Sequence, residues 1–306
     1  MLLLSDLLEE YRYHCLARGL TEKTMINKNQ ELKQIESYLK EKRAITEMDA
    51  ITVHDLRVYF RGKQSSGLQA QSIVSMMKII SAFFNWCVKE EYIKESPMKK
   101  VETPKVPRKV LSGFTPKEVV KMIDAFSYKT YLEARNKALI AMMADCGLRA
   151  MEIRGLLSIN VKETTILVNG KGNKERIVFI SPTLKKILIR YERLKKQYFK
   201  DKIVKSDAYF LTYQGDFMSH IALYNAVKEA GKRAGIEDKR VSPHTFRHFY
   251  SVQALNSGMD VYTLSRLLGH SDIGITQRYL NSMTAEQLEG KAISSSPLMN
   301  LRRADK

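Results

Sequence analysis

A proline-containing basic segment near residue 100 places the strongest constraint on how this chain can fold. Residues 95–113 read ESPMKKVETPKVPRKVLSG, with prolines at positions 97, 104 and 107 among lysines and an arginine. Proline lacks the backbone donor that a helix needs and turns the preceding residue away from helical geometry. We therefore expect a basic extended linker over residues 96–113, and two domains, 1–95 and 114–306.

The first domain is predicted to contain helices only. Leu7, Tyr11 and Cys15 recur every four residues, which is the spacing of one buried helical face. Thr52 and Asp55 have the spacing of a capping box at the start of a later helix. This pattern predicts a four-helix domain. Its later helices are expected over residues 21–41, 52–62 and 71–91.

The second domain is predicted to be mostly helical with one β-hairpin. Thr115 and Glu118 have capping-box spacing, and Pro116 follows in the first turn, as is typical of a helix start. Residues 164–180 carry Val, Ile, Leu and Thr on both sides of a Gly-Lys-Gly-Asn turn, which predicts a hairpin, and residues 209–212 suggest a further short strand. The expected fold class is therefore mainly α with a small β-hairpin (α+β). Helices are expected over residues 131–147, 149–156, 182–200, 219–234, 244–257, 261–268, 273–280 and 284–293.

The chain is strongly basic, and most of the positive charge lies in the second part. The formal net charge is +18, of which residues 1–100 contribute +3 and residues 101–306 contribute +15. A charge bias of this size indicates a polyanionic partner, and nucleic acid is the first candidate. Solubility alone explains such an uneven distribution less well.

The three cysteines, at positions 15, 87 and 146, have no recognisable spacing. An odd number of unpatterned cysteines argues against a disulfide framework and favours a reducing, cytoplasmic location. The start MLLLSDLLEEYRYH lacks the basic region of a signal peptide. No apolar run reaches the ~20 residues of a membrane helix, so no membrane partner is expected.

The second domain carries side chains suited to attack on a phosphodiester. Arg149 lies in DCGLRAMEI, His244 and Arg247 lie in SPHTFRHFY, His270 lies in LLGHSD and Tyr279 lies in ITQRYLN. Arginine stays charged and donates two parallel hydrogen bonds to phosphate oxygens, so Arg149 and Arg247 are candidates for a phosphate clamp. A tyrosine oxygen can act as the nucleophile where positive charge and a base assist loss of its proton. Such an ester keeps the energy of the broken bond, so no cofactor is expected.

The leaving oxygen of the DNA strand also needs a proton. Lys171 lies at the tip of the predicted basic hairpin, where its ammonium group can reach into a groove, so it is the candidate general acid. His244 and Arg247 are three residues apart and share a helical face. His270 can approach the same phosphate from another segment.

A metal site is the competing interpretation of the histidines. His244 and His248 have the i, i+4 spacing of the zinc ligands in zincins. The residues between them lack the glutamate base of those enzymes, and no nearby carboxylate is an obvious third ligand. Each candidate residue taken singly is also compatible with packing, a surface ion pair or an ordinary turn. The combination and its order favour DNA strand chemistry over a metal nuclease.

At this point the chain resembles the tyrosine recombinase/integrase family, including its Xer-like and transposon-encoded members. The matching stretches are Gly147-Leu148-Arg149 with Glu152, the GKGNKER run from Gly170 to Arg176, HTFRH at 244–248, LGH at 268–270 and Tyr279 nine residues later. The resemblance covers essentially the whole chain, because residues 1–95 are similar to the helical core-binding domain of the family. Phe246 stands where Leu is commoner, and Ala150-Met151 replace a small polar pair.

The resemblance implies a role for each matching residue. Arg149 and Arg247 would hold the scissile phosphate with support from His270, Lys171 would protonate the leaving hydroxyl and His244 would act as acid and base. Tyr279 would form a 3′-phosphotyrosyl bond. Enzymes of this family clamp duplex DNA between two domains, form tetramers on two sites and exchange strands through a Holliday junction. The resemblance is also compatible with a partner recombinase or a directionality factor, and it implies that the protein acts at the nucleoid.

Two further interpretations stay open, and so does the role of the C-terminus. A type IB topoisomerase shares the phenol chemistry but relaxes DNA as a monomer, and a non-catalytic DNA-binding protein could keep the fold alone. The C-terminal helix of the family docks on a neighbouring subunit, which suggests the same role for residues 285–301. An irregular tail is the alternative.

Overall fold

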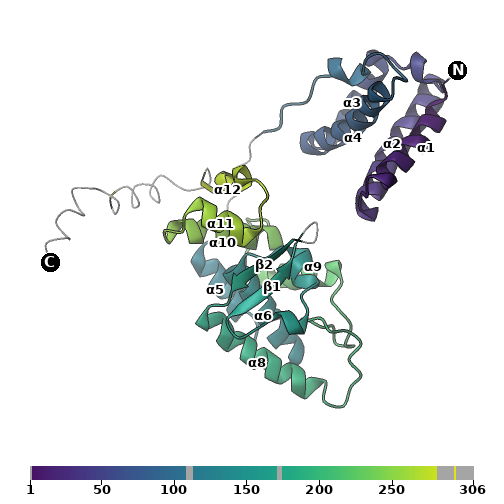
Figure 1. Ribbon diagram of the computed structural model, residues 1–306. Helices are drawn as coiled ribbons and strands as arrows, with labels where there is room; N and C mark the ends of the chain where they lie inside the picture. The colour runs from purple at the N-terminus through teal and green to yellow at the C-terminus, as the bar shows by residue number, and fades with distance from the viewer. Residues whose placement is uncertain (1, 108–112, 171–173, 281–292, 294–306) are drawn as a thin grey trace. The chain divides into compact units, whose positions relative to one another are not determined.

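The computed structural model describes residues 2–107, 113–170, 174–280 and 293. Lys171 and the tail proposed for exchange, apart from Ile293, therefore lie outside the described residues. The chain divides into two compact units, Met1–Lys109 and Val110–Lys306, which are described separately (Figure 1). Within the described ranges, no helix is long and apolar enough to cross a membrane.

The N-terminal unit consists of helices, as the sequence predicts. Thr21 accepts a hydrogen bond at the start of the second helix, and Thr52 and Asp55 form the predicted capping box at the start of the third. The third helix continues past Gly62 to Ser65. The elements are α1 (Leu4–Ala17), α2 (Glu22–Arg43), α3 (Val53–Ser65) and α4 (Ala70–Lys89), with the short 3-10 helices η1 (Met48–Ala50) and η2 (Pro97–Lys100).

The N-terminal core forms between the apolar faces of these helices. Leu7, Tyr11 and Cys15 of α1 are buried, which confirms the predicted helical face. The ring of Tyr11 lies 5.4 Å from that of Phe83 and 5.2 Å from that of Trp86, both on α4. Rings at these separations add to the energy of burial, so α1 and α4 are held together by aromatic packing.

The beginning of the basic segment after α4 differs from an extended linker. Met98 in η2 is buried within the N-terminal core. Arg57 of α3 donates a hydrogen bond of 2.8 Å to the backbone oxygen of Lys100. Burial of Met98 and the hydrogen bond from Arg57 thus hold residues 97–100 against α3 and α4.

The second unit is mostly helical with one hairpin, which confirms the predicted fold class. Thr115 and Glu118 form the predicted capping box. Residues 209–212 do not form a strand, because the only bridge there is the isolated one of Leu211 with Phe217; Ala208, just before the segment, makes another with Leu157. The elements are α5 (Pro116–Asp124), α6 (Tyr131–Cys146), α7 (Ala150–Arg154), η3 (Ser158–Asn160), β1 (Thr165–Asn169), β2 (Glu175–Phe179), α8 (Pro182–Tyr198), α9 (His220–Arg233), α10 (Pro243–Asn256), α11 (Val261–Leu268) and α12 (Ile273–Leu280).

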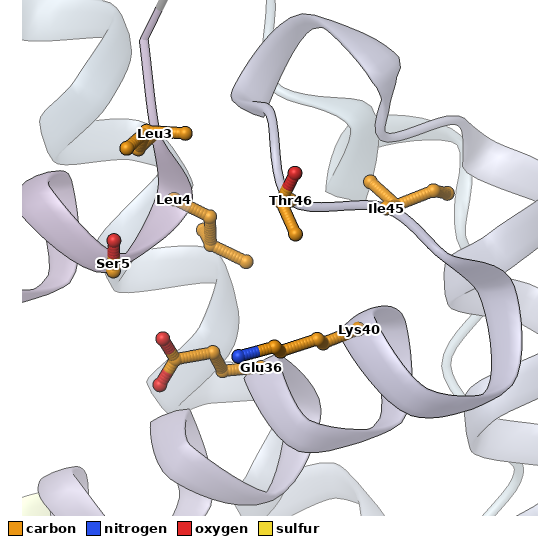
Figure 2. A pocket seen from close by; sticks show the side chains of 7 residues that line it. All are labelled: Leu3, Leu4, Ser5, Glu36, Lys40, Ile45 and Thr46. Atoms are coloured by element: carbon orange, nitrogen blue, oxygen red, sulfur yellow. The ribbon is translucent and has the colours of Figure 1, made fainter.

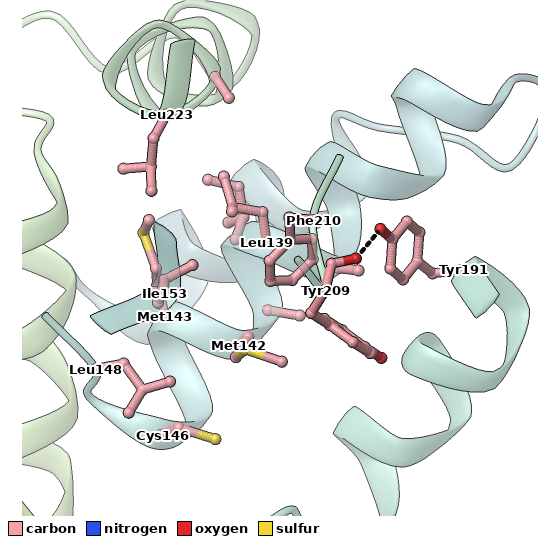
Figure 3. Close-up of a cluster of buried hydrophobic side chains, with 14 of the residues drawn as sticks. Leu139, Met142, Met143, Cys146, Leu148, Ile153, Tyr191, Tyr209, Phe210 and Leu223 are labelled. Atoms are coloured by element: carbon pink, nitrogen blue, oxygen red, sulfur yellow. Dashed lines mark hydrogen bonds between the residues drawn. The ribbon is translucent and has the colours of Figure 1, made fainter. Parts of the chain in front are cut away.

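The core of this unit surrounds α6, which packs against α8, α9 and α10. Figure 3 shows Leu148 and Ile153 at one edge of this core, and Tyr191 donating a 2.7 Å hydrogen bond to the backbone oxygen of Tyr209 at another. The hairpin pairs antiparallel, with Thr165 opposite Phe179. Because Leu148 and Ile153 are buried, they fix the backbone from which Arg149 and Glu152 project.

A separate small apolar cluster holds the C-terminal helices together. Leu255 of α10, Leu264 and Leu268 of α11 and Tyr279 of α12 are all buried in it. These helices lie side by side in Figure 1. The helix that bears Tyr279 is therefore packed onto the helices that bear Arg247 and precede His270.

Candidate active site

Arg149 is positioned by the short turn between α6 and α7. Gly147 ends α6 in the left-handed region, with φ of +59°, and a side chain there would clash with the ring of Tyr250. The backbone N–H of Arg149 donates to Glu152 Oε2 at 2.8 Å, and its Nη1 donates to Glu152 Oε1 at 2.8 Å. Its Nη2 also donates to the backbone oxygen of Gly269 at 3.2 Å. The guanidinium is therefore tied to both α7 and the residue before His270.

Arg176 of β2 completes this arrangement. In the sequence it is noted only as the last residue of the GKGNKER run. Its Nη1 and Nη2 donate to the two carboxylate oxygens of Glu152 at 2.9 and 2.7 Å. Its Nε donates to the backbone oxygen of Leu267 at 2.7 Å. Burial alone would raise the pKa of Glu152, but hydrogen bonds from Arg176 and Arg149 outweigh it and lower the pKa to about 2. Glu152 is therefore an anion at neutral pH and holds two arginines.

Arg247 of α10 lies at the centre of the site. Its side chain is almost fully buried, with the residue 3% exposed. Nη1 donates to the backbone oxygen of Gly147 at 2.8 Å, and Nη2 donates to that of Leu268 at 2.7 Å. Burial, followed by the charge of Arg149, lowers the pKa of Arg247 to about 10, which leaves the guanidinium charged at neutral pH.

His270 contacts Arg247 directly. Its Nε2 lies 2.9 Å from Arg247 Nη2, and its Nδ1 lies 2.8 Å from Thr276 Oγ1. Loss of hydration and the nearby charges of Arg247, Arg149 and Arg176 lower the pKa of His270 to about 4. The imidazole is therefore neutral under ordinary conditions.

Tyr279 lies on the other side of His270. The two rings are 6.3 Å apart between centroids and nearly parallel, and the ring of His248 lies 5.5 Å from that of Tyr279. Tyr279 is 8% exposed and belongs to the apolar cluster of α10 to α12. The candidate nucleophile is thus packed beside the histidine that contacts Arg247.

His244 begins the helix that carries Arg247. Ser242 caps α10 and Pro243 occupies its first position, so the chain enters the helix with His244 in the first turn. The residue is exposed to solvent. Partial loss of hydration, together with the charges of Arg247, Arg240 and Arg149, lowers the pKa of His244. His244 is thus a neutral imidazole near the arginines.

The base of the hairpin turn lies beside the same carboxylate. Lys171 is outside the described residues, but Gly170 and Lys174 are described and close the turn through a 2.8 Å backbone hydrogen bond. A Cβ at Gly170 would lie 3.6 Å from Arg176 Nη1 and 3.9 Å from Glu152 Oε1. The residue that precedes Lys171 is therefore next to the Glu152–Arg176 pair.

The arrangement brings four predicted residues together: Arg149, Arg247, His270 and Tyr279. Three arginines, counting Arg176, are balanced at close range by one carboxylate, so the site carries net positive charge suited to an anion. In the part of the chain that the structure describes, no three His, Cys, Asp or Glu side chains are grouped to hold a metal ion.

The pocket shown in Figure 2 is elsewhere. It encloses about 290 Å³ in the N-terminal unit, between the start of α1, α2 and residues 45–46. Glu36 and Lys40 of α2 line it together with apolar side chains such as Leu4. None of the described residues predicted to act on a phosphodiester lines this pocket.

Comparison with known proteins links both units to DNA recombination enzymes. Residues 113–286 match the model of the phage integrase family, and residues 6–103 match that of the phage integrase SAM-like domain. Tyrosine recombinase XerD of Listeria monocytogenes serotype 4b (strain F2365) is 26% identical over 279 residues, which are 90% of this chain and 94% of the relative. XerD of Proteus mirabilis is 28% identical over 240 residues, 77% of this chain and 75% of the relative.

Solved structures share the fold. The Tn1549 transposon integrase (residues 82–397) in complex with transposon right end DNA gives a TM-score of 0.73 at 15% identity, covering 96% of this chain and 99% of that solved chain. The XerH site-specific recombinase bound to palindromic difH substrate gives a TM-score of 0.72 at 18% identity, with coverage of 92% and 82%. The model of the phage integrase family matches residues 113–286, which are more than half of this chain. This chain therefore belongs to the phage integrase family.

Proposed function

We propose that the protein is a site-specific DNA recombinase that cleaves and rejoins duplex DNA through a covalent phosphotyrosyl intermediate. One observation carries the proposal: Arg247 joins the turn of Arg149 to His270, whose ring lies against Tyr279. Cations that can bind a phosphate and a phenol that can attack it thus occur in one connected site. Family membership and the relatives' names support the same function.

In the proposed reaction, Tyr279 is the nucleophile. Its phenolic oxygen attacks the scissile phosphorus and forms a P–O bond, while the bond from phosphorus to the leaving 5′ oxygen of the strand breaks. The phenol proton passes to His244, which is neutral and able to accept it. Lys171, next to the described base of the hairpin, gives the proton that the 5′ oxygen requires. The reverse reaction by a second 5′ hydroxyl rejoins the strand.

Arg149 and Arg247 stabilise the additional negative charge on the non-bridging oxygens, with His270 in support. Both guanidinium groups are held by fixed backbone oxygens, so little reorganisation is needed when the charge develops. Preorganised donors of this kind contribute about 2.7–4 kcal/mol each to transition-state stabilisation.

We propose residues 1–95 as the core-binding domain and residues 114–306 as the catalytic domain. Duplex DNA is the partner, and the net charge of +18 supports contacts to its phosphates. Lambda integrase, which shares the fold, has been solved as a tetramer bound to a Holliday junction. This supports assembly of several copies here. The tail of residues 285–301 would contact a neighbouring subunit, and the protein would act at the nucleoid.

The experiment that tests this function is capture of a covalent adduct. Full-length protein is incubated with fragments of its source genome, denatured in detergent, and the DNA that stays attached is sequenced. The wild-type protein should retain one class of DNA site, and Tyr279→Phe should retain none. Tyr262→Phe is the matched control, because Tyr262 is an exposed tyrosine on the neighbouring helix α11. Absence of any wild-type adduct would leave a DNA-binding protein without chemistry.

Two further measurements distinguish a recombinase from a topoisomerase and from a metal nuclease. Exchange of strands between two labelled copies of the captured site identifies a recombinase, whereas relaxation of supercoiled DNA without exchange identifies a topoisomerase. Adduct formation should persist in EDTA, and its loss there would favour the metal nuclease.

A further inference from the structure

Thr276 makes a contact that the proposed function does not use. It lies on α12, its side chain is fully buried, and its Oγ1 is 2.8 Å from Nδ1 of His270. Threonine hydroxyls can both donate and accept, so the distance alone does not assign the proton. The contact made by the other ring nitrogen, Nε2, assigns the proton.

Arg247 determines which nitrogen of His270 carries hydrogen. A guanidinium has donors only, and Arg247 Nη2 lies 2.9 Å from His270 Nε2, so Nε2 must be the acceptor. A neutral imidazole that accepts at Nε2 is protonated at Nδ1. His270 therefore donates from Nδ1 to the hydroxyl oxygen of Thr276. The two contacts are compatible with this single tautomer only.

We propose that Thr276 is a positioning residue: its hydroxyl oxygen accepts from Nδ1 of His270 and holds the ring in the orientation in which Nε2 accepts from Arg247 and fixes the guanidinium of the site. In the free protein the lone pair of His270 Nε2 therefore faces Arg247. The mechanistic consequence rests on the proposed function. The tautomer itself does not.

The groups around His270 favour the same neutral form. Arg247, Arg149 and Arg176 oppose a second proton on the ring, and Glu152 only partly offsets them. The ring of Tyr279 is another neighbour, nearly parallel at 6.3 Å. Among the described residues, the carboxylate of Glu152 does not supply enough negative charge to stabilise an imidazolium.

The same hydrogen bond connects the nucleophile's helix to the phosphate site. Thr276 and Tyr279 are three residues apart on α12 and are the buried residues of that helix. Residues at this spacing lie on one helical face. The position of α12 is thus linked to Arg247 through Thr276 and His270, and a displaced α12 would break the hydrogen bond from His270 Nδ1.

The test begins with the free protein, so that it does not depend on DNA chemistry. Full-length protein with ¹⁵N-labelled histidine is examined by NMR at neutral pH, and the His270 signals are assigned by their loss in His270→Gln. We expect a protonated, pyrrole-type Nδ1 and an unprotonated Nε2. The opposite pattern, with hydrogen on Nε2, would overturn the proposal.

Two substitutions of Thr276 separate positioning from packing. Thr276→Val keeps the shape and removes the hydroxyl, and Thr276→Ser keeps the hydroxyl and removes a methyl group. We expect Thr276→Val to lose the hydrogen bond from His270 Nδ1, measured as faster exchange of the Nδ1 proton with water, and to form the covalent adduct on the captured DNA site about 10- to 100-fold more slowly, as for other groups that orient a functional histidine. Thr276→Ser should keep both the slow proton exchange and the rate.

The comparison stays decisive if the valine variant folds poorly. Equal losses in the serine variant, or normal Nδ1 proton exchange and a normal rate in a folded valine variant, would contradict the positioning role. If the wild-type protein shows the expected tautomer but forms no adduct, the proposed function fails and the assignment of Thr276 stands.

Discussion

Arg176 holds Glu152 with both terminal nitrogens, at 2.9 and 2.7 Å from the two carboxylate oxygens. The same carboxylate accepts from the backbone and side chain of Arg149. One buried anion thus connects the hairpin strand β2 with the turn that carries a candidate phosphate ligand. Its loss leaves two arginines facing each other without a counterion.

Replacement of Glu152 should therefore destabilise the second unit strongly. We expect Glu152→Gln to lower the free energy of unfolding by about 3 kcal/mol, because removal of one partner leaves buried charge uncompensated. Glu163→Gln, at an exposed glutamate before β1, is the matched control and should change little. Denaturant unfolding of the two variants measures the difference, and equal stabilities would contradict the role of the carboxylate.

The contribution of Glu152 should depend on pH in a defined direction. Its pKa is lowered from 4.5 to about 2 in the folded protein, so the native state favours the anion. The stability it contributes is complete above the unfolded pKa of 4.5 and is lost as pH falls toward 2. The difference in unfolding free energy between wild type and Glu152→Gln should thus shrink between neutral pH and about pH 3. A difference that stays constant would contradict the ion pairing.

His270 should make the stability of the protein depend on pH in a higher range than Glu152 does. Its pKa is lowered from 6.5 to about 4, so the unfolded state binds a proton more readily than the folded state. Stability should fall as pH decreases from 6.5 to 4 and then level off as far as this residue is concerned. His270→Gln removes the titrating ring, and its unfolding free energy should vary less than that of the wild type in this window. An identical pH dependence in the two proteins would count against the lowered pKa.

Gly269 should tolerate no side chain, for two separate reasons. Its φ is +64°, and a Cβ there would lie 3.0 Å from Arg176 Cδ and 3.1 Å from Arg176 Nη1. Gly235 has a similar φ of +70° but nothing within 4 Å, so Gly235→Ala measures the backbone strain alone. That strain is about 1–2 kcal/mol for an alanine. Gly269→Ala should be less stable than Gly235→Ala and should also form the adduct more slowly; equal stability and normal adduct formation would show that Arg176 moves freely.

Arg247 should not be replaceable by lysine. Its guanidinium contacts the oxygens of Gly147 and Leu268 and the Nε2 of His270, a geometry that a single ammonium group cannot reproduce. We expect Arg247→Lys to slow adduct formation by about 100-fold or more. Arg193→Lys, at an exposed position of α8, should react like the wild type. A normal rate for Arg247→Lys would remove Arg247 from the proposed mechanism.

The sequence predicts the elements of this fold well where the signals are local. The capping boxes at Thr52 and Thr115 and the glycine that ends α6 mark helix boundaries through residues close in the chain. The strand expected at residues 209–212 is absent because its backbone finds only an isolated bridge partner, which local composition does not reveal.

The residues of the site are also predicted only in part. The order of Arg149, Arg247, His270 and Tyr279 along the chain predicts them as a set, and the structure brings them together. The sequence does not predict the contacts of Arg176, because they join segments that are distant in the chain. The side chain of Arg176 reaches the backbone of Leu267, and Thr276 acts through a fully buried hydroxyl that no motif distinguishes from a packing residue.

The central claim is that Tyr279 becomes esterified to a DNA strand end, and mass spectrometry of the captured adduct tests it most directly. The adduct is digested with nuclease and protease, and the peptide that carries a residual nucleotide is sequenced. The account predicts a phosphonucleotide on Tyr279, present in Tyr262→Phe and absent in Tyr279→Phe. A nucleotide on any other residue, or an undiminished adduct in Tyr279→Phe, would contradict it.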